Sequence, residues 1–289
     1  MPIHSVTSKD NARLKDLRKA LSAPGRGAPA LVGIEGPNLI EEALRAGLRL
    51  KTIFIAQGTE RLLDKLHVTR DIEVLQLSKK LLDSALATET PQSVAALIEP
   101  PQWTWDHLLG LHRKSIPLVV VLAGLQDPGN LGTILRSAEA FGASGVVSLP
   151  GTVSAWNAKA VRASAGSVFR MPVISADAED CIPRLHGAGI TVFATLSRAA
   201  QDAHRANFAR PTALIIGNEG GGVPGSLAAT ADCTITIPCP GPVESLNAAV
   251  AASVLLYEAS RQRAFQTSEP AGKPQHSSKE SNRTAGAVR

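Results

Sequence analysis

The chain has 289 residues, enough for one large or two ordinary domains that each bury a core. Hydrophobic residues make up 44% of the sequence and charged residues 19%, a balance that excludes wholesale disorder. The longest apolar runs are too short to span a membrane, and the polar N-terminus does not resemble a signal peptide. We therefore expect a soluble cytoplasmic protein with no membrane partner, whose net charge of +5 is compatible with a polyanionic ligand.

The cysteine and aromatic contents narrow the class of protein and the type of core further. Cys181, Cys233 and Cys239 are odd in number and unclustered, so we expect neither a disulfide framework nor a metal site. Aromatic residues are only 3%, so Ala, Val, Leu and Ile must build the core. That composition suits a parallel sheet buried under helices on both faces.

The N-terminal third alternates strand and helix patterns. The first thirty residues have helical spacing at Leu14, Leu17 and Leu21 and are rich in Lys and Arg, which fits either a helix facing nucleic acid or an ordinary solvated face. Further elements are expected in the following order: a strand at 30–36, a helix from Pro37 to Gly47, and strands at 50–56, 72–78 and 94–100. We predict an α/β domain over residues 1–100, followed by a linker or bridging helix at 101–115.

The alternation restarts at Ile116 and continues to Phe265. Strands are expected at 118–124, 145–150, 190–196, 213–217 and 234–238, with helices at 130–141, 158–163 and about 245–264. Repeated strand-helix units with short turns predict a parallel sheet covered on both sides, over residues 116–265. Residues 266–289 have almost nothing to bury, and we predict a disordered tail there.

A glycine-rich stretch, "IGNEGGGVPG" at 216–225, has the G-x-G-x-x-G spacing of a dinucleotide fingerprint. Such fingerprints lie in the first strand-helix turn of a domain, whereas several units precede this one. Pro224 also removes a backbone N–H where phosphate donors are wanted. A glycine loop after a buried strand still lets a ligand approach the backbone closely, so we expect a ligand other than a dinucleotide here.

Two further stretches accompany this loop in the same domain. "LQDPGNLGTILRSAEAFGA" at 125–143 has Asn130 in position to cap a helix that carries Arg136. "IPCPGPVESLNAAVAASVLLYEASRQ" at 237–262 has Ser245 as a possible cap of the last helix, with Leu246, Val250 and Val254 as its expected core stripe. Each stretch alone has an ordinary structural explanation.

In this order, the three stretches resemble the motifs of the SpoU (TrmH-like) family of RNA ribose 2′-O-methyltransferases in the SPOUT superfamily. "KAVRASAGSVFRMPV" at 159–173 looks like the segment that this family places between its first two motifs, and residues 1–100 resemble its small, ribosomal-protein-like substrate-binding domain. Two positions depart from the expected pattern: Cys239, where an apolar residue such as Met is usual, and Ser93, where Gly is expected after Gln92.

The resemblance implies an α/β domain with a deep trefoil knot, a homodimer with each site near the dimer interface, an RNA substrate and S-adenosylmethionine as cofactor. Ribosomal RNA is the expected substrate. The cofactor-binding residues implied are Leu196, Gly217, Asn218, Gly220, Ile237, Pro238, Ser245, Leu246 and Asn247. The catalytic residues implied are Arg136, Asn130, Glu219, Ser245 and Asn247.

A guanidinium is a poor general base, because lowering its pKa from above about 12.5 to near 7 costs on the order of 7 kcal/mol. We therefore expect Arg136 to grip a phosphate next to the target ribose, and Glu219 to orient Arg136 or a ligand amine. A transfer RNA methyltransferase and an inactive RNA-binding protein of the same fold are the alternatives. A hydrolase finds no support, since "RASAG" around Ser164 lacks the first glycine of a nucleophile elbow.

Overall fold

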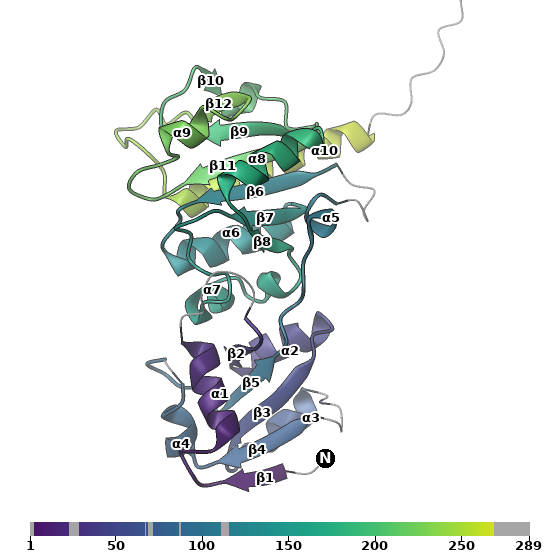
Figure 1. Ribbon diagram of the computed structural model, residues 1–289, viewed down its shortest axis with the longest axis vertical. Coiled ribbons are helices and arrows are strands. Elements are labelled where there is room, and N and C mark those ends of the chain that lie inside the picture. Colours follow the sequence, from purple (N-terminus) through teal and green to yellow (C-terminus); the bar gives the residue numbers. More distant parts are fainter. Residues whose placement is uncertain are drawn as a thin grey trace, which may run out of the picture.

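The computed structural model describes residues 3–22, 29–66, 68, 72–86, 88–110 and 116–268, with side chains up to residue 264. Two sheets lie one above the other along the long axis of the molecule (Figure 1). We call the part built on the first sheet the N-terminal unit, up to β5, and the part built on the second the C-terminal unit, from β6 onward.

The N-terminal unit has a mixed five-stranded sheet in the order β1-β4-β3-β5-β2. Its strands are β1 (Ile3–Val6), β2 (Val32–Glu35), β3 (Leu50–Ala56), β4 (Glu73–Leu77) and β5 (Val94–Ile98). Strands β1, β4 and β3 are parallel, whereas β5 runs antiparallel to both β3 and β2. Its helices are α1 (Ala12–Leu21), α2 (Pro37–Arg45), α3 (Arg61–Lys65) and α4 (Lys79–Asp83).

Two of these helices follow the sequence pattern closely. Helix α1 buries Leu14, Leu17 and Leu21 as predicted, on one face of the sheet. Helix α2 begins at Pro37, whose fixed φ suits the first helical position, after Gly36 in a positive-φ conformation of 95°. It buries Leu39 and Ile40 on the other face.

The C-terminal unit has a seven-stranded sheet in the order β10-β12-β9-β11-β6-β7-β8, with every pair parallel. Its strands are β6 (Leu118–Ala123), β7 (Gly145–Ser148), β8 (Val173–Ser175), β9 (Thr191–Thr195), β10 (Gln201–Asp202), β11 (Thr212–Gly217) and β12 (Cys233–Thr236). The predicted parallel sheet is therefore confirmed. Strands β8 and β10 were not predicted, because three and two residues are too short to show a pattern.

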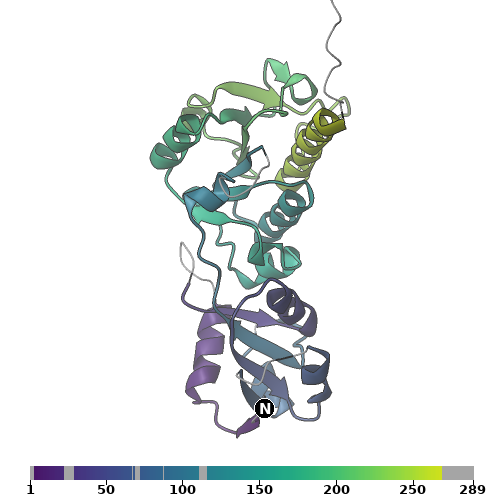
Figure 2. The same ribbon diagram turned by 90° about the vertical axis from the view of Figure 1, so that its right-hand side faces the viewer.

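Helices cover both faces of this sheet (Figure 2). They are α5 (Trp105–Leu108), α6 (Pro128–Ala140), α7 (Ala158–Ala163), α8 (Ala178–Gly187), α9 (Gly225–Ala228) and α10 (Ala248–Ser268), with short 3-10 turns at Ser167–Phe169 and Ala203–Arg205. Alternation along β6 explains the layers: Val120 packs on the side of α6 and α10, and Val121 packs on the side of α8.

Two predicted helix starts are wrong by a few residues. The cap of α6 is Asp127, not Asn130, because Pro128 occupies the first helical position and the Asp127 carboxylate accepts the Asn130 N–H at 2.8 Å. Helix α10 begins at Ala248, not Ser245. The Asn247 side chain accepts the backbone N–H groups of the next turn, at 2.9 Å from Ala249.

The predicted core stripe of α10 is also wrong. Val250 and Val254 are 49% and 41% exposed. The buried side consists of the residues Ala248, Ala249, Ala252, Leu255, Leu256 and Ala259. Small alanines let this helix lie close against α6 and β11. Val250, Val254 and Tyr257 face outward.

The two units share one contiguous buried cluster, which contains Ile40 and Ile53 of the N-terminal unit and Leu131 and Leu255 of the C-terminal unit. The predicted linker holds α5, and its residues 111–115 lie outside the described residues. Of the predicted tail, residues 266–268 continue α10, and residues 269–289 lie outside the described part. Among the described helices, none is both long enough and apolar enough to cross a membrane.

Candidate functional site

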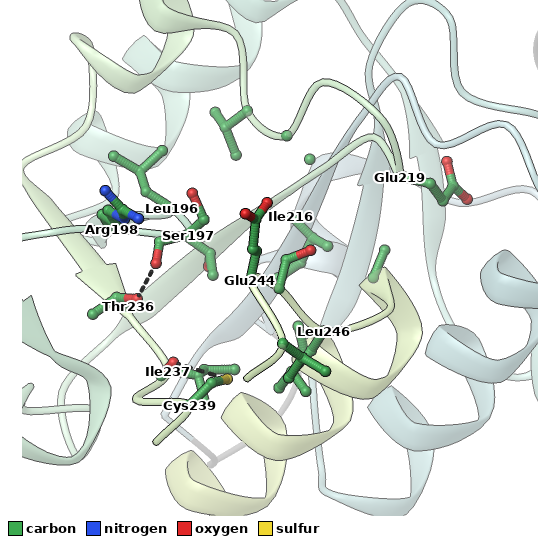
Figure 3. Close-up of a pocket in the computed structure, with 18 of the residues that line it drawn as sticks. Leu196, Ser197, Arg198, Ile216, Glu219, Thr236, Ile237, Cys239, Glu244 and Leu246 are labelled. Carbon is green, nitrogen blue, oxygen red and sulfur yellow. Dashed lines mark hydrogen bonds between the residues drawn. The ribbon is translucent and has the colours of Figure 1, made fainter. Parts of the chain in front are cut away.

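A cavity of about 840 Å³ opens where the carboxyl ends of β9, β11 and β12 meet. Loops after parallel strands converge at this edge, which is the usual place for a ligand in an open α/β sheet. The cavity is lined by residues 195–199, 216–223, 236–239, 241–246, 248 and 251. Figure 3 shows Leu196, Ser197 and Arg198 on one side of the cavity, with Glu244 and Leu246 from the loop that precedes α10.

The glycine loop after β11 is held in a tight turn by its own backbone. The N–H and C=O groups of Asn218 pair with those of Gly222, at 3.1 and 3.0 Å. The Asn218 side chain accepts the N–H groups of Gly220 and Gly221 and donates to the Gly124 carbonyl. A Cβ on Gly217 would lie 2.0 Å from the Gly222 carbonyl carbon, so only glycine permits this closure.

A hydrogen-bonded cluster joins the three stretches singled out in the sequence. Glu219 Oε1 accepts the Asn130 Nδ2–H at 2.9 Å, and Asn247 Nδ2–H donates to Asn130 Oδ1 at 3.1 Å. Glu219 also accepts the backbone N–H groups of Gln126 and Asp127. The carboxylate therefore fixes the loop that begins α6, and Asn130 connects it to the start of α10.

The electrostatics of this cluster favour ionised carboxylates. Burial alone would raise the pKa of Glu219. The hydrogen bonds that its carboxylate accepts from the Asn130 side chain and from backbone N–H groups, including that of Gln126, outweigh burial and leave the pKa lowered. The pKa of Asp127 is lowered by its hydrogen bond from the Asn130 N–H, aided by Lys159. Both groups are thus acceptors at neutral pH, and neither is prepared to act as a general acid.

Arg136 projects from the exposed side of α6, and no hydrogen bond or ion pair holds its guanidinium within the part of the chain that the structure describes. The residue that follows, Ser137, contacts Ser253 of α10 through a hydroxyl pair at 2.8 Å. Helix α6, which carries Arg136, therefore packs directly against α10. Glu219 contacts the loop before α6 and makes no hydrogen bond or ion pair with Arg136 among the described residues, so its role in orienting Arg136 stays a prediction.

The structure brings all but one of the predicted cofactor-binding residues together at the cavity. Those that line the cavity are Leu196, Gly217, Asn218, Gly220, Ile237, Pro238, Ser245 and Leu246, and Glu219 lines it as well. Asn247 does not line it and instead joins the cluster with Asn130. In Figure 3, Glu219 lies apart from the other labelled residues.

Several lining residues were absent from the predicted site, among them the polar Thr195, Arg198 and Glu244. Thr195 ends β9, and its Oγ1 is buried without a hydrogen-bond partner in the described structure. Arg198 and Glu244 lie on loops whose polar residues carry no pattern of their own. Among the described residues, no group of His, Cys, Asp or Glu is placed to hold a metal ion.

The sequence matches two protein families in succession. Residues 34–104 match the family described as RNA 2′-O ribose methyltransferase substrate binding, and residues 117–257 match the SpoU rRNA Methylase family. The second range contains the whole sheet of the C-terminal unit, and the first contains β3, β4, β5 and part of β2.

Individual relatives agree with these matches. The 23S rRNA (guanosine(2553)-2′-O)-methyltransferase RlmP of Bacillus subtilis is 34% identical over 252 residues, 87% of this chain and 97% of that protein. The 23S rRNA (uridine(2479)-2′-O)-methyltransferase of Streptomyces viridochromogenes is 33% identical over 204 residues, covering 68% of this chain and 70% of that one.

A solved structure resembles the whole fold. The SpoU methyltransferase AviRb from Streptomyces viridochromogenes, in complex with AdoMet, superposes with a TM-score of 0.77 at 29% identity. The match covers 88% of this chain and 98% of that one. The α/β architecture is thus that of the SPOUT fold, to which the knotted topology belongs. From the two sheets, the cavity and these matches together, the chain belongs to the SpoU family of RNA ribose 2′-O-methyltransferases.

Proposed function

We propose that this protein transfers a methyl group from S-adenosylmethionine to a ribose 2′-hydroxyl of ribosomal RNA. The observation that carries the proposal is the cluster of Asn130, Glu219 and Asn247 at the glycine loop, because it connects the cavity with the helix that bears Arg136. The named relatives act on 23S rRNA, which favours ribosomal over transfer RNA. They modify different nucleosides, so the target nucleotide is specific to each protein.

The cavity suits the cofactor in size and in chemistry. Its volume of about 840 Å³ is within the range of small-molecule sites. The unpartnered Oγ1 of Thr195 and the backbone of the glycine loop offer polar groups to a ligand. Arg198 and Glu244 place opposite charges in the lining, which complement an amino-acid moiety. When bound, S-adenosylmethionine supplies a methyl group already activated by a positive sulfur.

The chain's own residues then have to place the ribose. Arg136 carries a guanidinium with no internal partner among the described residues, so it is available to a phosphate, to which its planar fork is suited. We assign it to the phosphate beside the target ribose, which fixes the 2′-hydroxyl for in-line attack. The proton leaves through that phosphate, through a transiently neutral arginine or through water. Asn130 and Asn247 keep this helix in register with the cavity.

The same proposal includes a homodimer. Val250, Val254 and Tyr257 are between 41% and 57% exposed and recur at helical spacing on α10. A second copy would bury this strip and bring its own chain close to Arg136. Light scattering of the purified protein should give twice the mass of one chain. The proposed location is the cytoplasm, where ribosomal RNA is found.

The N-terminal unit, with the predicted boundary at residue 100, is proposed to bind the RNA. It corresponds to the matched substrate-binding family. The C-terminal unit is proposed to extend over 116–265. An inactive RNA-binding protein of the same fold is the rival, and it is disfavoured because all five predicted catalytic residues are present: Asn130, Arg136, Glu219, Ser245 and Asn247.

The test has two stages. Titration calorimetry with S-adenosylmethionine, with NAD as comparator, should give saturable binding of the first only. Transfer of labelled methyl groups to 23S rRNA should follow, and the product should resist alkaline cleavage at one phosphodiester, because a methylated 2′-oxygen cannot attack it. Binding of NAD alone would overturn the family assignment of the cavity. Cofactor binding without transfer to any ribosomal RNA would favour the inactive protein.

A further inference from the structure

Arg170 connects the two units by forming ion pairs with Glu42 of the N-terminal unit and with Glu139 of the C-terminal unit. Its Nη1–H donates to Glu42 Oε2 on α2 at 2.7 Å. Its Nε–H and Nη2–H donate to the two carboxylate oxygens of Glu139 on α6, at 2.6 and 3.1 Å. All three side chains are about a quarter to a third exposed, so solvent screens them only in part.

The surrounding charges support this arrangement. The other oxygen of Glu42 accepts from Arg45, so both of its oxygens are occupied. Burial alone would raise the pKa of Glu139, but the hydrogen bond from Arg170 and a second from Ser167 leave it lowered. The same contacts raise the pKa of Arg170. Glu139 is therefore a charged acceptor at neutral pH.

The turn before Arg170 has an unusual backbone. Ala165 has φ of 49° and is the one non-glycine residue with positive φ in the described chain, and Gly166 follows with φ of 87°. A Cβ on Gly166 would lie 2.7 Å from Glu42 Cβ. The left-handed conformation is costly for Ala165, although not for a glycine, and such strain persists only where surrounding contacts enforce it. Here the turn lets α2 approach the C-terminal unit directly.

Helix α7 continues the connection toward the site. Its first residue, Ala158, packs against the cluster that contains Leu14 and Leu17 of α1. On its other side α6 lies so close that a Cβ on Gly132 would be 2.5 Å from the Ala160 carbonyl oxygen. Figure 1 shows α7 between the N-terminal unit and α6. Contacts thus run without interruption from α1 and α2 to the helix that carries Arg136.

We infer that Arg170 is a positioning residue: with Glu42, Glu139 and the turn at residues 165–166, it fixes the N-terminal unit at a set distance and angle from Arg136. This inference rests on the proposed function. An RNA held by the N-terminal unit would present its target ribose at a defined place only if the two units cannot swing. Rigid attachment also keeps the effective concentration of the held RNA high at the site. The role requires no contact between Arg170 and RNA or cofactor.

The experiment compares four variants in the full chain: Arg170→Ala, Arg170→Lys, Glu42→Gln and Gly166→Ala. The last inserts a methyl group between the units and leaves the charges intact. Arg184→Ala is the control, because the partners of Arg184, the Asp180 carboxylate within α8 and the Trp105 ring of α5, both lie outside the N-terminal unit. Small-angle X-ray scattering reports the distance between the units and needs no RNA. Methylation is measured with a long ribosomal RNA fragment and with a short hairpin that bears only the target nucleotide.

For Arg170→Ala and Gly166→Ala we expect a larger radius of gyration, unchanged affinity for S-adenosylmethionine, and a KM for the long RNA raised on the order of 10-fold or more. The methylation rate on the hairpin should change little. General destabilisation would instead reduce methylation of the long RNA and of the hairpin alike. Arg170→Lys should recover part of the effect. In a double-mutant cycle, Glu42→Gln should add little to Arg170→Ala.

Unchanged scattering in all four variants would overturn the inference, even if the wild type methylates no RNA and the proposed function itself fails. With an active wild type, a KM for the long RNA equal to that of Arg184→Ala would overturn it as well. Equal losses on the long RNA and on the hairpin would also do so, because they would indicate damage at the site itself.

Discussion

Asn130 and Asn247 lie 117 positions apart in the sequence, and the Nδ2–H of Asn247 donates to the Oδ1 of Asn130 at 3.1 Å. In each of these side-chain amides, both the oxygen and the nitrogen are hydrogen-bonded. The Nδ2–H of Asn130 donates to Glu219, and the Oδ1 of Asn247 accepts the Ala249 N–H. The polarity of one amide therefore determines that of the next, and the chain of bonds ends at a carboxylate. A change at Glu219 should therefore alter the structure at the start of α6 and at the start of α10.

The change Glu219→Gln tests this coupling. Glu219 accepts three hydrogen bonds, from Gln126 N, Asp127 N and Asn130 Nδ2, whereas a glutamine has one acceptor oxygen and would turn an NH2 group toward a donor. We expect the single-turnover methylation rate to fall roughly 10²-fold as α6 loses register. Affinity for S-adenosylmethionine should change far less. Glu179→Gln, at an exposed position in the first turn of α8, is the control; equal rates in the two variants would contradict the coupling.

Arg136→Ala should remove most of the activity, on the order of 10²-fold or more, because the phosphate beside the ribose loses its charged partner. Cofactor binding should be retained, since Arg136 does not line the cavity. Arg136→Lys keeps the charge without the planar fork and should recover only part of the rate. Rates are measured at saturating cofactor, with calorimetry on each variant. A rate unchanged in Arg136→Ala would remove this residue from the mechanism.

The sequence predicted the architecture well because the relevant signals are local. The buried strands of the C-terminal unit appear as continuous apolar runs, and Pro37 marks the start of α2 at the correct residue. The motifs also indicated which loops meet, although that step rested on family resemblance and not on periodicity. Spacing alone would have assigned residues 216–225 to a dinucleotide.

The errors arise where distant parts of the chain decide the outcome. On α10, apolar residues occur on every side, so the sequence pattern could not tell that the small alanines face the core and Val250 and Val254 face outward. The contacts of Glu219 with Gln126 and Asp127 join residues more than ninety positions apart. Nothing near Arg170 in the sequence indicates its partners Glu42 and Glu139. Such pairs become visible only once the fold is formed.

Gly217→Ala should abolish cofactor binding. The added methyl group would lie 2.0 Å from the Gly222 carbonyl carbon and 2.2 Å from the Val223 nitrogen, so the loop could not close. Both neighbours are backbone atoms and have no side-chain freedom to relieve the clash. Gly225→Ala is the matched control, because a Cβ there meets nothing within 4 Å and its φ is not positive. Calorimetry that finds equal affinity in the two variants would show that the cavity does not depend on this loop.

The cap of α6 should make the stability of the protein depend on pH through Asp127. Its pKa is lowered from 3.8 by the hydrogen bond from Asn130 N–H, so ionised Asp127 stabilises the fold above about pH 4, and this contribution is lost as the pH falls through the lowered value. In Asp127→Asn the amide oxygen can still cap, which should leave stability at pH 7 within about 0.5 kcal/mol after loss of the exposed Lys159 pair. Asp127→Ala should lose about 1 kcal/mol at every pH above that range, since no cap remains.

Urea unfolding from about pH 6 to about pH 3 separates these cases, because all other carboxylates titrate alike in the three proteins. The free energy of unfolding of the wild type should fall more steeply at the acid end than that of Asp127→Asn, so that the two curves converge there. The Asp127→Ala curve should lie below both at neutral pH and approach the wild type as Asp127 becomes protonated. Parallel curves for wild type and Asp127→Asn would mean that the charge of Asp127 does not contribute to the cap, and that its oxygen serves only as a neutral acceptor.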